Sequence, residues 1–263
     1  MSEAAVPPAT STGVGTPPIV LLHAFPLDGR MWAPQVDALA PDYQVVVPDL
    51  RGFGAAREQV VEVAETGLMA QDVARLLDDL GLGRVVVCGA SMGGYVALAF
   101  ALAHPERLRG LVLASTKATA DDQRAAAARL EMAERVLAEG VGFLPEAMLP
   151  VLLGETSRRR RPDLVGRVSR MIREQDPAAV AAAQRGMARR PDVSDRLAAV
   201  TVPVLVVSGA EDERFGPEVG RELAAAFPDA RFVQVGGAGH LPNLEQPEQV
   251  NEALLDFVAP LWI

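Results

Sequence analysis

The chain has 263 residues, 49% of them hydrophobic, a formal net charge of −9 and one cysteine, Cys88. Its length fits one large α/β domain or a domain with an insertion, and its negative charge disfavours nucleic acid as a partner. One cysteine excludes an internal disulfide and a thiolate metal cluster. No apolar run approaches the roughly 20 residues of a membrane span and no signal-peptide pattern is present, so we expect a cytoplasmic protein without membrane contact.

Residues 1–17 are rich in Pro, Thr, Ser and Gly, which predicts a flexible lead-in. Beyond it, short valine-rich apolar segments are typical of strands buried on both faces. Segments of helical period, such as residues 66–82, separate most of them. This alternation predicts an α/β fold with a mostly parallel sheet flanked by helices. The expected strands lie at residues 19–23, 44–49, 84–89, 108–115, 202–209 and 230–237.

About eighty residues separate the fourth and fifth of these strands, far more than one crossover needs. They contain no strand pattern, and the pair Asp176-Pro177 is a typical helix start. We expect four helices here, at residues 121–139, 143–153, 162–174 and 177–189. An insertion at the carboxyl end of a strand lies over the edge where α/β sheets bind ligands. The sequence therefore predicts a helical cap at 117–190 between core segments 18–116 and 191–263.

Residues 89–93 read Gly-Ala-Ser-Met-Gly, a G-x-S-x-G pattern centred on Ser91. The pattern follows a predicted strand and opens a helical segment, which is the setting of a nucleophile elbow. Glycines around the serine allow backbone segments to approach closely at such a turn. We interpret Ser91 as a nucleophile; the alternative is a glycine-rich turn with a bystander serine.

A serine hydroxyl needs a base to take its proton and a third group to orient that base. Of the three histidines, His104 ends a helix and His23 ends the first strong strand, which leaves His240 in the loop after the last strand. The acid is expected from the acidic loop after the strand at 202–209. Glu211, Asp212 and Glu213 are its candidates.

An oxyanion hole requires two preorganised donors. The backbone N–H of Met92, the residue after the nucleophile, is one candidate. The loop after the first strong strand offers the second, the N–H of Phe25. The alternative for that loop is an ordinary strand-to-helix turn.

Five segments in this order resemble the α/β-hydrolase superfamily: "LLHAFPLDGRMW", "VVPDLRGFG", "GASMGGYVALAFALAHPERLRGLVLAS", "VPVLVVSGAED" and "GAGHLPNLEQPEQVNEALLDF". The sequence is most similar to the cofactor-free esterase and lactonase branch that includes 3-oxoadipate enol-lactonases. This resemblance implies Ser91 as nucleophile, Asp212 as acid, His240 as base, and Phe25 and Met92 as oxyanion donors. It also implies that the cap follows the sixth strand of the family fold, and that no cofactor or metal is required.

The chain departs from the family pattern at its start, where the usual antiparallel edge strands are expected to be shortened or absent. His23-Ala24 replaces the usual His-Gly pair, and "AAREQ" follows "DLRGFG" where relatives have a small hydroxyl residue. Epoxide hydrolases and haloalkane dehalogenases of this fold use an aspartate at the elbow, so Ser91 argues against both.

The expected function is therefore cleavage of small to medium carboxylic esters or lactones through an acyl-enzyme, by a monomer or homodimer. The alternatives are a ligand receptor or signalling protein with slow turnover, and a carbon–carbon bond hydrolase or perhydrolase with the same triad. The arginine run at 158–161 is interpreted as a solvated loop, with attraction of a carboxylate as the alternative. A mostly apolar pocket is expected, lined by Trp32, Met132, Phe143, Met148, Met187, Phe215 and Leu241.

Overall fold

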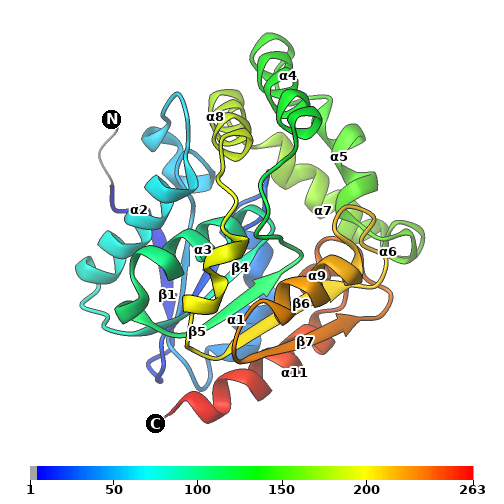
Figure 1. Cartoon of the computed structure of the whole chain (residues 1–263). Helices are drawn as coiled ribbons and strands as arrows, with labels where there is room; N and C mark the ends of the chain where they lie inside the picture. Colours follow the sequence, from blue (N-terminus) through cyan, green and yellow to red (C-terminus); the bar gives the residue numbers. More distant parts are fainter. Residues whose placement is uncertain (1–4, 263) are drawn as a thin grey trace.

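The computed structural model describes residues 5–262 and is built on a seven-stranded sheet (Figure 1). The strands lie side by side in the order β1-β3-β2-β4-β5-β6-β7. Only β1 runs antiparallel to its neighbour, β3, and the other pairs are parallel. The strands are β1 (Ala9–Thr12), β2 (Ile19–Leu22), β3 (Val45–Pro48), β4 (Val85–Ala90), β5 (Leu108–Ala114), β6 (Val204–Gly209) and β7 (Ala230–Val235).

The six strands predicted from apolar runs are all present, from β2 to β7. Every residue of β2, β3, β4 and β6 is buried, as expected for strands covered on both faces. Each fully buried Val or Leu side chain contributes roughly 1.5–3 kcal/mol relative to exposure. The sheet core therefore supplies much of the stability that holds the loops at its carboxyl edge.

No sequence pattern indicated β1, which lies inside the segment expected to be a flexible lead-in. All four of its residues are exposed, and they pair with β3 from Ala9 opposite Pro48 to Thr12 opposite Val45. Its side chains bury no apolar face, so no hydrophobic pattern could mark it. The lead-in expectation does not hold for these residues, and the sheet has a short antiparallel edge strand.

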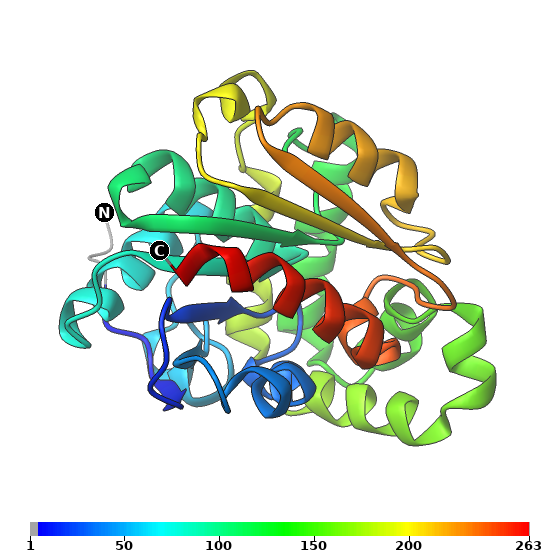
Figure 2. The ribbon, with the colours of Figure 1, turned by 90° about the horizontal axis from the view of Figure 1, so that it is seen from below.

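Helices cover both faces of the sheet (Figures 1 and 2). On one face α2 packs against α3, and α9 lies on β6 and β7. On the other face α1 packs against α11. Short 3-10 helices occupy Gly29–Trp32, Gly54–Gln59, Pro105–Arg107, Ser194–Ala199 and Ala259–Trp262. The helices outside the insertion are α1 (Ala33–Leu39), α2 (Thr66–Asp79), α3 (Met92–Ala103), α9 (Gly216–Ala225), α10 (Pro242–Glu245) and α11 (Pro247–Val258).

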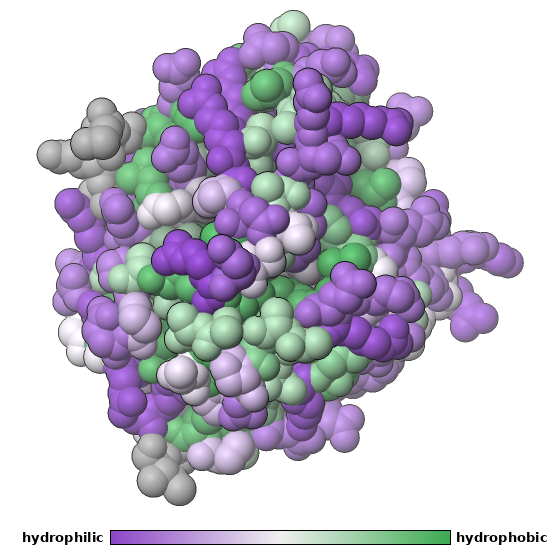
Figure 3. All heavy atoms as spheres, viewed as in Figure 1, coloured by the Kyte–Doolittle hydropathy of each residue, from purple (hydrophilic) through white to green (hydrophobic). Residues whose placement is uncertain are grey.

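Five α-helices between β5 and β6, here called the inserted helices, lie together at one edge of the sheet (Figure 1). The side chains seen over α4 and α8 in the same view are largely hydrophilic (Figure 3). Four of the helices correspond to those expected, with ends that differ by a few residues. The fifth, α6, contains most of the arginine run at 158–161, which was expected to be a loop. The inserted helices are α4 (Gln123–Glu139), α5 (Leu144–Leu152), α6 (Glu155–Arg160), α7 (Pro162–Arg173) and α8 (Pro177–Ala188).

Helix α6 was not predicted, because it is a short and largely exposed segment without apolar periodicity. Arg158, Arg159 and Arg160 are all solvent-exposed, so the run is solvated as expected, although it is helical. No helix in the part of the chain between residues 5 and 262 is long and apolar enough to cross a membrane.

Candidate active site

Ser91 occupies the sharp turn that joins β4 to α3. Its backbone has φ of +50° and ψ of −110°, a region that costs free energy for a residue with a side chain. The turn is held from both sides: the Ser91 N–H donates to Ala114 O at 2.8 Å, and Thr116 Oγ1 donates to Ser91 O at 2.9 Å. The strained turn is therefore fixed by the end of the neighbouring strand.

Two glycines flank the turn because the backbone leaves no room for a side chain there. A Cβ atom on Gly89 would lie 2.2 Å from Gly93 O, and one on Gly93 would lie 2.2 Å from Leu22 O. This close approach brings the end of β2 against the start of α3. It explains the spacing of glycines that the sequence pattern displays.

Three polar side chains from three loops form a continuous hydrogen-bonded chain. His240 Nε2 lies 2.8 Å from Ser91 Oγ, and His240 Nδ1 lies 2.9 Å from Asp212 Oδ2. All three side chains are buried. An ionised carboxylate only accepts hydrogen bonds, so Nδ1 carries the ring proton and Nε2 is free to accept from the serine hydroxyl.

Asp212 is held in its ionised form. Its Oδ1 accepts the backbone N–H groups of Arg214 at 2.9 Å and Phe215 at 3.1 Å. Burial alone would raise the pKa of this carboxyl, but His240 and the two backbone donors outweigh burial and place the pKa below its ordinary value. The carboxylate is thus oriented and charged where it meets the imidazole.

The loop after β2 lies beside the hydrogen-bonded residues Ser91, His240 and Asp212. Leu27 N–H donates to Ala24 O at 2.9 Å, which closes a turn, and the Phe25 ring packs edge-on against Phe53. Phe25 lines the same hollow as Ser91. Met92 is the first residue of α3, where backbone N–H groups have no acceptor within the helix. The two amides named from the sequence therefore come from segments adjacent to the serine.

Two neighbouring hollows lie between the Ser91–His240–Asp212 hydrogen bonds and the inserted helices. The inner one has a volume of about 10 Å³, room for about one water molecule. The outer one has a volume of about 320 Å³. They share a wall formed by Phe25, Arg129, Met148 and Arg214.

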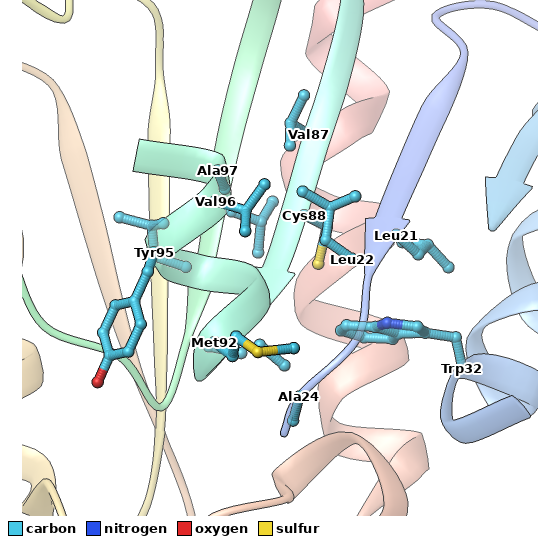
Figure 4. Packing of buried hydrophobic residues seen from close by; sticks show 14 of the residues in the cluster. Leu21, Leu22, Ala24, Trp32, Val87, Cys88, Met92, Tyr95, Val96 and Ala97 are labelled. Atoms are coloured by element: carbon cyan, nitrogen blue, oxygen red, sulfur yellow. The ribbon is translucent and has the colours of Figure 1, made fainter. Parts of the chain in front are cut away.

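The structure brings together most, but not all, of the residues expected to line a pocket. Met148 and Met187 line the inner hollow, and Met132 and Phe215 line the outer one. Trp32 is fully buried in the core beside β2 (Figure 4). Leu241 is also fully buried, and Phe143 packs under the Arg135 guanidinium. Among the described residues, these last three line neither hollow.

Tyr95, Arg129, Leu152 and Arg214 line the inner hollow and were missed from the sequence. Spacing offered a signal for two of them. Tyr95 lies one helical turn after Ser91, and Arg214 lies two residues after Asp212. Arg129 and Leu152 come from inserted helices whose packing the sequence does not reveal.

Within residues 5–262, no three His, Cys, Asp or Glu side chains are grouped as metal ligands would be. Cys88 lies inside β4, and burial raises the pKa of its thiol well above the ordinary value. We therefore interpret Cys88 as a core residue and not as a reactive thiolate.

Comparison with known proteins agrees with this geometry. A family model described as the alpha/beta hydrolase fold matches residues 17–247. A 2-hydroxy-6-oxononadienedioate/2-hydroxy-6-oxononatrienedioate hydrolase from Paraburkholderia phymatum is 31% identical, and the match covers 94% of this chain and 88% of that protein.

Two solved structures are also similar. A thermophilic esterase from Thermogutta terrifontis, solved with malate bound, is 43% identical with a TM-score of 0.94; the match covers 97% of this chain and 94% of that one. The enol-lactonase from Burkholderia xenovorans is 29% identical with a TM-score of 0.88, over 95% of both chains.

Proposed function

The chain belongs to the α/β-hydrolase family, and from that premise we propose that it is a serine hydrolase of small to medium carboxylic esters or lactones. The observation that supports this most is the hydrogen-bonded chain Ser91–His240–Asp212 at the carboxyl edge of the sheet. The esterase and enol-lactonase among its structural neighbours favour ester and lactone bonds over other substrates.

The geometry of the site supports the following reaction. Ser91 Oγ attacks the substrate carbonyl carbon while His240 Nε2 takes the hydroxyl proton, and Asp212 stabilises the resulting imidazolium. The N–H groups of Phe25 and Met92 stabilise the negative oxygen of the tetrahedral intermediate. His240 then protonates the departing alcohol oxygen, which leaves the acyl group on Ser91. Water, activated by the same imidazole, releases the acid and restores the serine.

We also assign the inserted helices as a cap, residues 117–190, over the core formed by 18–116 and 191–263. Met148 of α5 and Met187 of α8 line the same inner hollow as Ser91. Such a cover excludes water from the charged intermediate and strengthens each electrostatic contact within it. The narrow inner hollow favours short acyl groups, with the remainder of the substrate in the outer hollow.

A panel of p-nitrophenyl esters from acetyl to octanoyl tests the proposal with the wild type and Ser91→Ala. We expect hydrolysis that is fastest for the short esters, and a loss of roughly 10³-fold or more in kcat for the variant. No hydrolysis at any acyl length, or hydrolysis untouched by the substitution, would contradict it. The first of these outcomes would favour a ligand-binding role, or carbon–carbon bond cleavage as in the Paraburkholderia relative's name.

A further inference from the structure

Several positively charged side chains lie near Ser91, and the proposed ester reaction uses none of them. Arg129 of α4 and Arg214 of the loop after β6 line the same inner hollow as Ser91 and His240. Lys117 joins both arginines along the outer hollow. The chain as a whole carries a net charge of −9, so this concentration of cations is local and runs against the overall charge.

The carboxylates of the protein balance only part of this charge. Asp121 pairs with Lys117 at 3.1 Å, with Arg190 at 3.8 Å and with the Arg129 Nε in a short hydrogen bond. Arg129 also donates to Gln184 Oε1 at 3.1 Å. Arg214, in contrast, has neither a hydrogen bond nor an ion pair from its guanidinium to any residue in the range 5–262. Its nearest ring contact is Phe215, with 5.4 Å between guanidinium carbon and ring centre.

Arg214 lines both hollows, although the residue as a whole is solvent-exposed. Part of Arg214 reaches solvent, but burial of the remainder, and then the like charge of Arg129, lower the pKa of its guanidinium. Two like charges on one wall repel each other, and an anion placed between them removes that repulsion. The hollow is therefore complementary to a negatively charged group.

Tyr95 supplies an independent sign of a missing partner. Its side chain is 3% exposed, and its hydroxyl has no hydrogen-bond partner among the described residues. The Arg190 guanidinium stacks on the ring at 3.9 Å, which fixes the ring in place. The ring points away from the apolar cluster around Met92 (Figure 4) and lines the hollow beside Ser91. A buried hydroxyl without a partner costs free energy, so it marks a place where a ligand acceptor fits.

We propose that the site takes an ester or lactone that carries a carboxylate, which Arg214 and Arg129 bind as cations and Tyr95 Oη binds as a hydrogen-bond donor. This assignment rests on the proposed function and narrows its substrate class. Arginine suits the role because its planar donors match the two oxygens of a carboxylate.

The walls of the hollows define the remainder of such a substrate. Met148 and Leu152 provide apolar surface in the same inner hollow as the arginines and the serine, which suits a short hydrocarbon spacer. The arginines lie on the wall that the two hollows share. The carboxylate thus lies at the junction of the hollows, with the scissile carbonyl at Ser91.

Two esters with acyl chains of equal length test the proposal: the mono-4-nitrophenyl ester of glutaric acid and 4-nitrophenyl pentanoate. We expect the wild type to have the higher kcat/KM for the anionic ester. Arg214→Gln should lower the ratio of the two kcat/KM values at least tenfold, and Arg214→Lys should restore part of it. Because Arg214 has no protein partner, its replacement does not break an internal ion pair. Tyr95→Phe should lower the same ratio without lowering thermal stability.

Arg84→Gln is the matched control, since Arg84 is exposed and lies next to the start of β4, at the opposite edge of the sheet from Ser91. The carboxylate assignment would be overturned if Arg214→Gln left the ratio of the two kcat/KM values unchanged, including the case in which kcat/KM falls equally for both esters. Calorimetric titration with glutarate separates this failure from failure of the esterase proposal. Binding by the wild type that Arg214→Gln abolishes supports an anion site even without ester hydrolysis, and absence of glutarate binding contradicts it.

Discussion

At the scale of single residues, the proposed reactivity of Ser91 depends on the atoms around it. The hydroxyl meets an imidazole whose opposite nitrogen faces a buried carboxylate, 2.9 Å away. Two backbone N–H groups hold the other oxygen of that carboxylate and keep it from rotating. Asp212 therefore sets both the tautomer and the direction of His240, which makes it a sharper test of the mechanism than the serine itself.

We expect Asp212→Asn to lower kcat for p-nitrophenyl acetate by roughly 10³ to 10⁴-fold. An amide NH₂ group can face Nδ1 only if the ring proton moves to Nε2, which then cannot accept from Ser91. Glu213→Gln is the control from the same loop, because Glu213 is exposed, and its kcat should stay near that of the wild type. A near-normal rate in Asp212→Asn would move the acid elsewhere.

The sequence allowed prediction of those site residues that follow directly from the order of the strands along the chain. Ser91, Asp212 and His240 each follow a predicted strand, and the carboxyl ends of parallel strands share one edge, so their proximity could be predicted. Trp32, Phe143 and Leu241 were expected at the pocket on residue type alone, although an aromatic or aliphatic side chain serves the core equally well. Arg214 was not predicted, because its proposed role depends on the absence of an ion-pair partner, and a sequence does not show which charged groups are paired.

At the scale of elements, a column of glycines joins the acid loop, the histidine loop and the inserted helices. A Cβ atom on Gly209 would lie 1.9 Å from Gly239 O, and one on Gly239 would lie 2.3 Å from the Gly154 backbone nitrogen. The Glu245 carboxylate accepts the N–H groups of Gly154 at 2.8 Å and Gly239 at 2.9 Å. The segment that carries His240 is thus fixed against the start of α6.

Gly239→Ala should therefore displace the residue next to it, His240, and lower kcat/KM for p-nitrophenyl acetate about 10²-fold, since a shift of about 1 Å can cost that much. Gly236→Ala is the matched control in the same loop, because a Cβ atom there would contact nothing within 4 Å. Its kcat/KM should stay within a few-fold of the wild type. Equal kinetics for the two variants would show that this contact does not position His240.

The elements themselves were predictable where they bury apolar surface. Strands β2 to β7 and most inserted helices have a hydrophobic pattern because one or both faces meet the core. Strand β1 and helix α6 have none, since their residues are largely exposed. Both are held through their backbone N–H groups: β1 by its ladder with β3, and the start of α6 by the Gly154 N–H, which donates to the Glu245 carboxylate. Such contacts leave little trace in the amino-acid pattern.

At the scale of the whole molecule, His23 ties the end of β2 to the segment after β3. The ring is fully buried; its Nδ1 donates to Ala24 O at 3.1 Å and its Nε2 accepts the Leu50 N–H at 2.9 Å. Both nitrogens are thus satisfied only in the neutral ring. Burial lowers the pKa of His23 from its ordinary 6.5, although Asp49 and Asp28 oppose the shift.

This lowered pKa predicts how the free energy of unfolding depends on pH. As the pH decreases through 6.5, His23 becomes protonated in the unfolded chain but stays neutral in the folded protein. The free energy of unfolding therefore decreases as the pH decreases, until the folded pKa is reached. Between pH 7.5 and 5.5 this residue therefore lowers the free energy of unfolding, by at most about 1.4 kcal/mol. Urea unfolding of the wild type and His23→Gln at both values measures it, because the contributions of His104 and His240 cancel in the difference. Equal pH dependence of the two proteins would show that His23 accepts a proton in the fold as readily as in the unfolded chain.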